Sequence, residues 1–435
     1  MTHTRSFRFT CPESQIPQVV ALLEAQGFRF TPEPFSSVCA KLTVEPFALG
    51  SSLAASFGLI YIQDRSSMLP PLMLAPATGS RVLDMCSSPG GKSGFLAQLT
   101  GPTGFVLANE PEGERLSNLR RNLFRMGLIH LASCGHDGTR LPFNAPVFDA
   151  ILLDPPCSGW GTVKKNPHVM NVWSPDKVEP LINLQRRLLT AACALVKPGG
   201  RIVYSTCTTN PAENEDQTAY ALEHLPLLLS PLAPPAGFAF HDPTRAELDG
   251  VLRVDEDRSQ AQGFYMSAFI KSDSTGTHLD ESHAIENLKP ASFLPGPHVV
   301  FDNSMDMSGA YWDGLPPGMF YRFREKIFFL AESAVLAPGL RIQGYYLGAE
   351  KKHRFRPHPR VRALVPSSPD KESIVETDVA ALLGLQSGQS RHQPPVGKSP
   401  GPLAPLYYDG LNGTDAPLPL GFLTRKGNRL LWSDK

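Results

Sequence analysis

The sequence feature that most constrains the fold is an alternation of apolar runs, glycine turns and helix-like segments between residues 80 and 271. Residues 112–127 and 180–196 have the apolar spacing of helices, and "KPGG" (197–200) is expected to end the second helix. This alternation is typical of a parallel sheet covered by helices. The expected strands are "RVLDM" (81–85), "FVLANE" (105–110), "FDAILLD" (148–154) and "RIVYST" (201–206).

The chain has 435 residues, which is more than one hydrophobic core normally serves, so several domains are expected. We predict an α/β architecture with a Rossmann-like domain at its centre and a β-rich C-terminal region, for which a PUA-like fold is one option. Residues 386–402 are rich in Gly, Ser and Pro and are expected to form a mobile loop. The expected division is a small α+β domain (1–70), the Rossmann-like domain (71–271), a polar linker (272–295) and the β-rich region (296–435).

The overall charge is balanced, with 41 Lys and Arg against 41 Asp and Glu. Any nucleic-acid partner must therefore be held by local positive charge. No apolar run approaches the length of a membrane span, and the first residues lack the apolar core of a signal peptide, so a cytoplasmic protein without membrane contact is expected. The seven cysteines lie at scattered spacings without a CxxC pair, which argues against a zinc site or a disulfide framework. A monomer without metal is the default expectation.

Four acidic residues follow the expected strands, namely Asp84, Glu110, Asp137 and Asp154. Ligands of open α/β sheets bind beyond the carboxyl ends of the strands, where these residues should meet. The turn after Asp84 ends in "GGKS", but a phosphate-binding P-loop would require glycine where Cys86 stands. A glycine turn beside acidic strand ends suits a cationic adenosyl cofactor, so we predict a site for S-adenosylmethionine.

Two cysteines also follow apolar strands. Cys157 lies in "LLDPPCSGWG" and Cys207 in "RIVYSTCTTN", so the predicted sheet brings both to its ligand-binding edge. Cys193 lies inside an expected helix and is interpreted as core packing. A functional role is therefore expected for Cys157 and Cys207.

Several ordered motifs together resemble the Nop/Sun family of RNA cytosine-5 methyltransferases, and within it the bacterial small-subunit rRNA enzymes of RsmF type. The motifs are "GLIYIQDRSSMLPP" (58–71), "DMCSSPGGKS" (84–93), "LLDPPCSGWGTVKKNP" (152–167) and "LQRRLLTAACALVKPGGRIVYSTCTTNPAENED" (184–216), with a weaker match at "PLPLGFLTRKGNRLLWS" (417–433). The resemblance implies methylation of carbon 5 of a cytosine in RNA, with S-adenosylmethionine as methyl donor.

The resemblance also implies the role of each site residue. Cys207 would be the nucleophile that adds to carbon 6 of the base, Cys157 the cysteine that releases the product, and Asp154 the group that contacts ring nitrogen 3. Glutamate at position 110 and serines before Pro89 depart mildly from the family pattern. The cofactor would be bound by Asp84, Cys86, Ser87, Ser88, Pro89, Gly90, Gly91, Lys92, Glu110, Asp137 and Asp154.

RNA contact is expected from two local basic segments, "TVKKNP" beside the presumed base pocket and "KKHRFRPHPRVR" (351–362) in the C-terminal region. Other readings stay open: a tRNA substrate, methylation of an exocyclic amine, and a non-catalytic RNA-binding assembly factor that retains the fold. Cys157 replaces the aromatic residue that follows Asp-Pro-Pro in amine methyltransferases, which argues against the second. The expected RNA-binding residues are Lys164, Lys165, Lys351, Lys352, Arg354, Arg356, Arg360 and Arg362.

Overall fold

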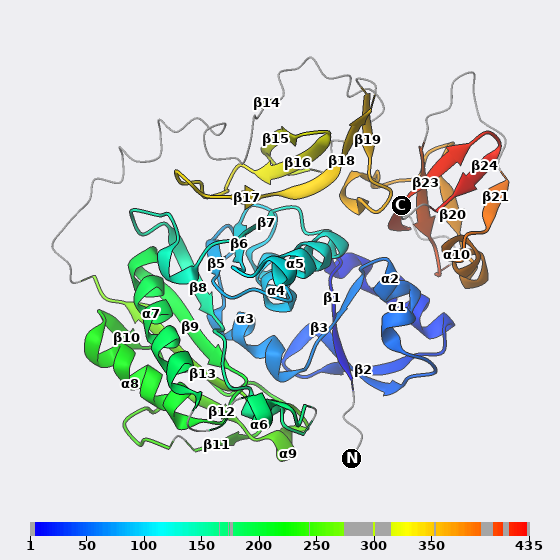
Figure 1. Cartoon of the computed structure of the whole chain (residues 1–435). Helices are drawn as coiled ribbons and strands as arrows, with labels where there is room; N and C mark the ends of the chain where they lie inside the picture. Colours follow the sequence, from blue (N-terminus) through cyan, green and yellow to red (C-terminus); the bar gives the residue numbers. More distant parts are fainter. Residues whose placement is uncertain are drawn as a thin grey trace.

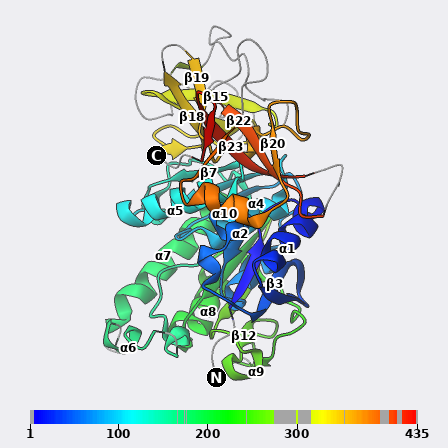
Figure 2. The same ribbon diagram turned by 90° about the vertical axis from the view of Figure 1, so that its right-hand side faces the viewer.

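A computed structural model of the chain places three smaller β-sheets around one central α/β unit (Figures 1 and 2). The structure describes residues 5–164, 166–172, 174, 177–242, 244–273, 299–300, 315–351, 354–392, 403–411 and 417–432. The predicted linker beyond residue 273 and the predicted loop from residue 393 lie outside these residues. The domain boundaries drawn from the sequence therefore stay a prediction.

The N-terminal part forms a four-stranded sheet in the order β2-β3-β1-β4, in which β1 pairs antiparallel with β3 and β4. Helix α1 begins with a proline in its first turn and packs its apolar face, including Leu22 and Leu23, into a buried cluster with Phe7 and Phe9 of β1. The elements are β1 (Ser6–Phe9), α1 (Ile16–Ala25), β2 (Arg29–Glu33), β3 (Ser36–Val44), α2 (Leu53–Ser56) and β4 (Ile60–Ile62).

The central sheet has the order β11-β12-β13-β9-β8-β5-β6-β7-β17, with β10 paired to β13. Its middle strands run parallel, as the alternation predicts, and β5 and β8 flank the point where the strand order reverses. The parallel strands are β5 (Arg81–Asp84), β6 (Phe105–Asn109), β7 (Leu131–Cys134), β8 (Phe148–Leu153) and β9 (Val196–Thr206), and the others are β10 (Leu227–Leu229), β11 (Phe240–His241), β12 (Leu252–Val254), β13 (Tyr265–Lys271) and β17 (Ile342–Gln343).

Helices cover both faces of this sheet (Figure 1). Leu69, Leu96 and Leu119 from α3, α4 and α5 share one buried cluster with Val82, while Leu188 of α7 and the α8 helix pack against the opposite face. The bounds are α3 (Leu69–Leu74), α4 (Gly91–Thr100), α5 (Gly113–Met126), α6 (Val169–Val172), α7 (Glu179–Leu195), α8 (Glu215–His224) and α9 (Glu256–Ser259).

Two features of the central sheet differ from the sequence expectation. Its edges are antiparallel, because β13 returns beside β9 and β17 from the C-terminal region pairs with β7, so the sheet is mixed. The "KPGG" segment does not form a separate turn: α7 ends at Leu195, and β9 begins at Val196 and runs through Gly199, which has a φ of 71°. The helix end itself falls where the sequence predicts it.

The C-terminal region forms two five-stranded sheets that lie over β7 and α5 and beside the N-terminal sheet (Figures 1 and 2). The first has the order β14-β15-β16-β18-β19 and the second β20-β22-β23-β24-β21, so the expectation of a β-rich region is confirmed. The bounds are β14 (Val299–Val300), β15 (Gly318–Phe323), β16 (Lys326–Ala331), β18 (Tyr345–Lys351), β19 (Arg354–Pro357), β20 (Ile374–Glu376), α10 (Val379–Gln386), β21 (Ser390–His392), β22 (Leu403–Tyr408), β23 (Leu418–Lys426) and β24 (Arg429–Leu431).

Buried clusters connect these sheets to the rest of the chain. Leu406 and Leu420 of the last sheet pack in the same cluster as Phe7 and Leu22 of the N-terminal sheet. Gln18 of α1 also donates a hydrogen bond to Asp409 at 3.2 Å. The first and last parts of the chain therefore share one core.

Candidate active site

The turn between β5 and α4 places a buried carboxyl group at the end of β5. One oxygen of Asp84 accepts a hydrogen bond from the Ser93 hydroxyl at 2.7 Å, and the other has no hydrogen-bond partner among the described residues. Burial raises the pKa of this carboxyl group to about 6. The chain then turns at Gly90, whose φ of 105° favours glycine. The result is a buried hydrogen-bond acceptor beside a glycine turn, which is what a polar ligand group requires.

The next two strand ends supply further acidic groups. Glu110, after β6, is buried, accepts the Glu112 N–H at 3.1 Å and pairs with Arg115 at 3.1 Å. Asp137, after β7, is exposed and caps a short turn, where the Thr139 N–H at 2.9 Å lowers its pKa. The predicted strand-end carboxylates therefore lie along one edge of the sheet.

Asn109 is a site residue that sequence reasoning missed. Its amide nitrogen donates to the Met85 and His136 carbonyls at 3.1 and 3.0 Å, and its oxygen accepts the His136 N–H at 3.0 Å. One buried side chain thus fixes the loops that follow β5 and β7. Its place directly before Glu110 in "LANE" was the only available signal.

Asp154 lies directly after β8 and pairs with the cofactor turn rather than standing alone. The Lys92 Nζ lies 2.6 Å from one Asp154 oxygen, and the Ser205 hydroxyl donates to the other at 2.9 Å. Burial lowers the pKa of Lys92, but the Asp154 carboxylate outweighs it, so the pKa of Lys92 is raised. Lys92, predicted as a cofactor residue, therefore forms an ion pair with Asp154, predicted as a catalytic residue.

The two predicted cysteines meet at the ends of β8 and β9. The Cys157 and Cys207 sulfur atoms lie 3.3 Å apart. The hydrogen bond from the Cys157 thiol lowers the pKa of Cys207, to which the Lys92 charge also contributes, while the same bond and burial raise the pKa of Cys157. The geometry therefore ionises Cys207 first and keeps the proton on Cys157.

A buried carboxylate that sequence reasoning did not single out fixes both cysteine loops. Glu213 accepts the Ser158 N–H at 2.9 Å, the Ser158 hydroxyl at 2.5 Å and the Asn210 amide at 3.0 Å. Gln185 of α7 donates to it at 3.0 Å. Because Ser158 follows Cys157 and Asn210 follows Cys207, Glu213 connects the two loops. Glu213 lies in the acidic run "AENED", directly after the second cysteine motif, and this run is a sequence signal that could have identified it.

The predicted RNA-binding residues are dispersed. Lys164 forms an ion pair with Asp257, and Arg356 is exposed on β19. Arg360 donates to the Ser56 carbonyl at 3.0 Å, and Arg362 to the Gly58 and Met126 carbonyls at 2.8 Å each. Lys165 and Lys352 lie outside the described residues, as do the side chains of Lys351 and Arg354. The contribution of this set to RNA binding stays a prediction.

Within the described part of the chain, no cluster of three or more His, Cys, Asp or Glu side chains is arranged to hold a metal ion. The same residues contain no helix that is both long and apolar enough to cross a bilayer.

Comparisons with known proteins show which proteins the chain is similar to. Residues 71–270 match the family described as 16S rRNA methyltransferase RsmB/F. The chain is 36% identical over 284 residues to a ribosomal RNA small subunit methyltransferase F of Salmonella paratyphi A, which covers 62% of this chain and 57% of the relative. It is 42% identical over 202 residues to the protein of that name from Shewanella amazonensis, covering 45% of this chain and 43% of the relative.

A solved structure gives the same result for the fold. The crystal structure of a methyltransferase homolog protein from Pyrococcus horikoshii is 33% identical, with a TM-score of 0.56 over 62% of this chain and 87% of that one. The chain spans little more than half the length of the Salmonella relative. The part of the chain that carries the Rossmann-like methyltransferase fold and the paired cysteines, residues 71–270, therefore belongs to the 16S rRNA methyltransferase RsmB/F family.

Proposed function

We propose that the protein methylates carbon 5 of a cytosine in RNA, with small-subunit rRNA as the substrate class and S-adenosylmethionine as methyl donor. The observation that carries the proposal is the 3.3 Å contact between Cys157 and Cys207 beside the Lys92–Asp154 pair. A cytosine ring is too weak a nucleophile at carbon 5 until a thiolate adds at carbon 6. A paired thiol and thiolate next to a carboxylate supply what that chemistry needs.

The residues after β5 and β6 fit the cofactor. The unpartnered oxygen of Asp84 and the buried Glu110 offer acceptors for its ammonium and ribose hydroxyl groups, with the turn from Cys86 to Lys92 around it. Asp137 lies at the outer end of the same edge. When bound, S-adenosylmethionine supplies a methyl group on a sulfonium as the electrophile.

Cys207 begins the proposed reaction. Its thiolate forms a bond to carbon 6, and the electron pair of the ring double bond becomes available at carbon 5. Charge develops at ring nitrogen 3 and the carbonyl oxygen, where Asp154 can donate a hydrogen bond if it holds a proton. Lys92, at 2.6 Å, orients this carboxyl group, and its raised pKa keeps a positive charge beside the charge that develops on the ring.

Cys157 then completes the proposed reaction. Once Cys207 is bonded to carbon 6 and carbon 5 carries the methyl group, Cys157 passes its thiol proton to solvent and takes the proton from carbon 5, directly or through water. The electrons of that bond restore the ring double bond between carbons 5 and 6, and the carbon–sulfur bond breaks to regenerate the Cys207 thiolate. Pro155 and Pro156 fix the backbone between Asp154 and Cys157 and remove two N–H donors from the surface that a flipped base would contact.

The test compares Cys207→Ala, Cys157→Ala and the double variant with wild type, using cofactor labelled in its methyl group and total small-subunit rRNA. Cys207→Ala should abolish methylation and every covalent protein–RNA adduct. Cys157→Ala should allow attack and methyl transfer but block release, so a labelled adduct should survive a denaturing gel. Cys193→Ala, which changes a buried thiol of α7 outside the site, is the matched control.

The possible outcomes separate the alternatives. An adduct with Cys207→Ala and none with Cys157→Ala would exchange the two roles. Label in an exocyclic amine, found by nucleoside analysis, would favour amine methylation, and modification of tRNA in place of rRNA would change the substrate class. Binding of RNA without any methyl transfer would leave the non-catalytic assembly factor as the better account.

A further inference from the structure

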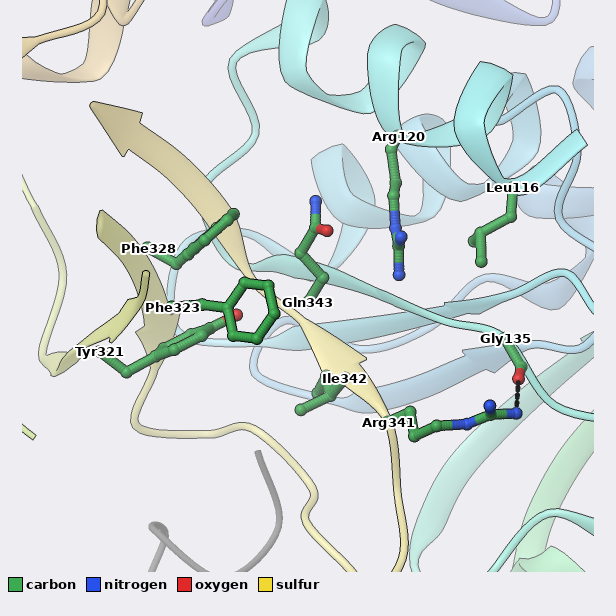
Figure 3. A pocket seen from close by; sticks show the side chains of 9 residues that line it. All are labelled: Leu116, Arg120, Gly135, Tyr321, Phe323, Phe328, Arg341, Ile342 and Gln343. Carbon is green, nitrogen blue, oxygen red and sulfur yellow. Dashed lines mark hydrogen bonds between the residues drawn. The ribbon is translucent and has the colours of Figure 1, made fainter. Parts of the chain in front are cut away.

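A cavity outside the methyltransferase site lies between the central sheet and the first C-terminal sheet (Figure 3). It encloses about 310 Å³ and is bounded by α5, the end of β7 and β17 on one side and by β15 and β16 on the other. That volume is at the lower end of the range for small-ligand pockets. The side chains that matter for its chemistry are Arg120, Tyr321, Phe323, Phe328, Arg341 and Gln343.

One wall of the cavity is aromatic. The rings of Tyr321 and Phe328 stack with centroids 5.2 Å apart and planes 16° from parallel. Figure 3 shows Phe323 beside this pair, and its side chain is half-buried, so it forms part of the open rim. Tyr321 and Phe328 are buried behind it, so Phe323 is the ring that offers a partly exposed surface on which an unpaired base can stack.

The other wall carries positive charge. Arg120 reaches from α5 and donates to the Ser133 hydroxyl at 3.0 Å, and Arg341 donates to the Gly135 carbonyl at 2.9 Å (Figure 3). Among the described residues, neither guanidinium forms an ion pair with a carboxylate. Their charge is therefore uncompensated locally, in a chain whose overall charge is balanced.

The cavity lies at the same edge of the sheet as the proposed active site. Ile342 and Gln343 of β17 pair with Cys134 and Ser133, the last residues of β7. Four strand spacings separate β8 from β17 in the sheet order, which corresponds to about 19 Å. An RNA strand that delivers a base to Cys207 can therefore continue along this edge.

We propose that this cavity binds an unpaired nucleotide of the RNA substrate, with its base on the wall of Tyr321, Phe323 and Phe328 and its phosphate at Arg120 and Arg341. The identity of the RNA in this inference rests on the proposed function, whereas the chemistry of the pocket does not depend on it. A base needs an aromatic face and a phosphate needs an uncompensated guanidinium, and the cavity presents both within one ligand-sized volume.

Two other arginines of the C-terminal region that were expected to bind RNA are already used in contacts within the protein. Arg360 and Arg362 donate to backbone carbonyls of other elements, which reduces what they can offer to phosphates. Arg341 also donates to a backbone carbonyl, but its side chain is exposed at the cavity, whereas those of Arg360 and Arg362 are half-buried. RNA fits the pocket better than a free nucleotide does, because the pocket lies on the edge along which an RNA strand at the cysteines can continue.

The experiment measures binding of a fluorescent single-stranded RNA to the full chain without cofactor, over a series of salt concentrations. Phe323→Ala should weaken binding about 5- to 150-fold, the range found when one stacking contact is removed. Arg120→Gln and Arg341→Gln should each reduce the salt slope by about one phosphate contact. Arg121→Gln, on the same helix but outside the cavity, and Phe47→Ala, an exposed ring of the N-terminal part, should change neither.

Further measurements make the outcomes distinct. Ultraviolet cross-linking followed by peptide mapping should attach the RNA to residues 321–328 in wild type. Circular dichroism should show that Phe323→Ala keeps the fold, although loss of this half-buried ring lowers its unfolding temperature. Equal RNA affinity in Phe323→Ala and wild type would overturn the proposal, even if the protein methylates cytosine normally. Tight binding of AMP or CMP with no loss of RNA affinity would make the cavity a free-nucleotide site instead. If the cavity variants lose RNA binding but no cytosine is methylated, the proposed function fails and the pocket assignment stands.

Discussion

Glu213→Gln tests whether one buried carboxylate holds the two cysteines in contact. The substitution keeps the shape of the side chain but replaces one of its oxygens with an NH2 group. Each oxygen of Glu213 now accepts two hydrogen bonds, from Ser158 N–H and Gln185 on one side and from the Ser158 hydroxyl and Asn210 on the other. The NH2 group of glutamine cannot accept hydrogen bonds, so the two donors on its side lose their acceptor.

The magnitude follows from the bonds that are lost. Two hydrogen bonds to a charged acceptor are worth about 1.5–3 kcal/mol each, or about 3–6 kcal/mol without relaxation. The Ser158 hydroxyl can turn toward Thr208, whose hydroxyl lies 2.7 Å away, and accept from the new amide. We therefore expect the free energy of unfolding to fall by about 2–4 kcal/mol.

The functional consequence should appear in the thiols. When the loop of Cys157 moves, its thiol no longer donates to Cys207, so the lowered pKa of Cys207 should rise toward that of an ordinary thiol. The assay is the pH dependence of alkylation by iodoacetamide, with Cys207 and Cys157 distinguished by peptide mass. Glu179→Gln is the matched control, because this exposed carboxylate of α7 accepts one bond, from Asn183.

An unchanged alkylation profile together with unchanged stability in Glu213→Gln would refute this reasoning. Reduced stability with an unchanged Cys207 profile would limit Glu213 to a purely structural role.

Two further predictions concern other buried groups. Burial raises the pKa of Asp84 from 3.8 to about 6, so the folded state binds the proton more tightly than the unfolded chain does. This group therefore contributes about 3 kcal/mol to the free energy of unfolding below about pH 4, and that contribution is lost as the pH rises through about 6. Asp84→Asn should remove this part of the pH dependence of unfolding, measured by denaturant titration, and an unaltered curve would contradict it. Arg362→Ala should lower the unfolding temperature, because the Gly58 and Met126 carbonyls lose their donor, whereas the exposed Arg356→Ala should not; equal melting curves for both variants would count against the structural role of Arg362.

The parts of the site that could be predicted from sequence follow from local pattern. Apolar runs of strand length ending in Asp84, Asp154 or a cysteine place those residues at one edge, because parallel strands end together. The contact between Cys157 and Cys207 needs only that β8 and β9 are neighbours, which the chain order favours.

The parts that could not be predicted depend on long-range pairing. β17 has only two residues and joins β7 some two hundred positions earlier in the chain, and no periodicity reveals so short a strand. The basic run near Arg360 has the composition of an RNA-binding segment, yet Arg360 and Arg362 donate to backbone carbonyls of distant elements. Composition gives the charge of a side chain, whereas its partner depends on the tertiary fold.

The core shared by the first and last sheets has a consequence for how the protein is made. Leu22 of α1 cannot be buried against Leu406 and Leu420 until nearly the whole chain has left the ribosome. Gln18 and Asp409 are 391 residues apart, and at usual elongation rates this interval lasts about 20–80 s. Throughout that time the apolar surface of the N-terminal part that packs against the last sheet is not covered by it. The newly made N-terminal part is therefore a natural client for a chaperone, and any chain that stops early would leave the same face open to aggregation.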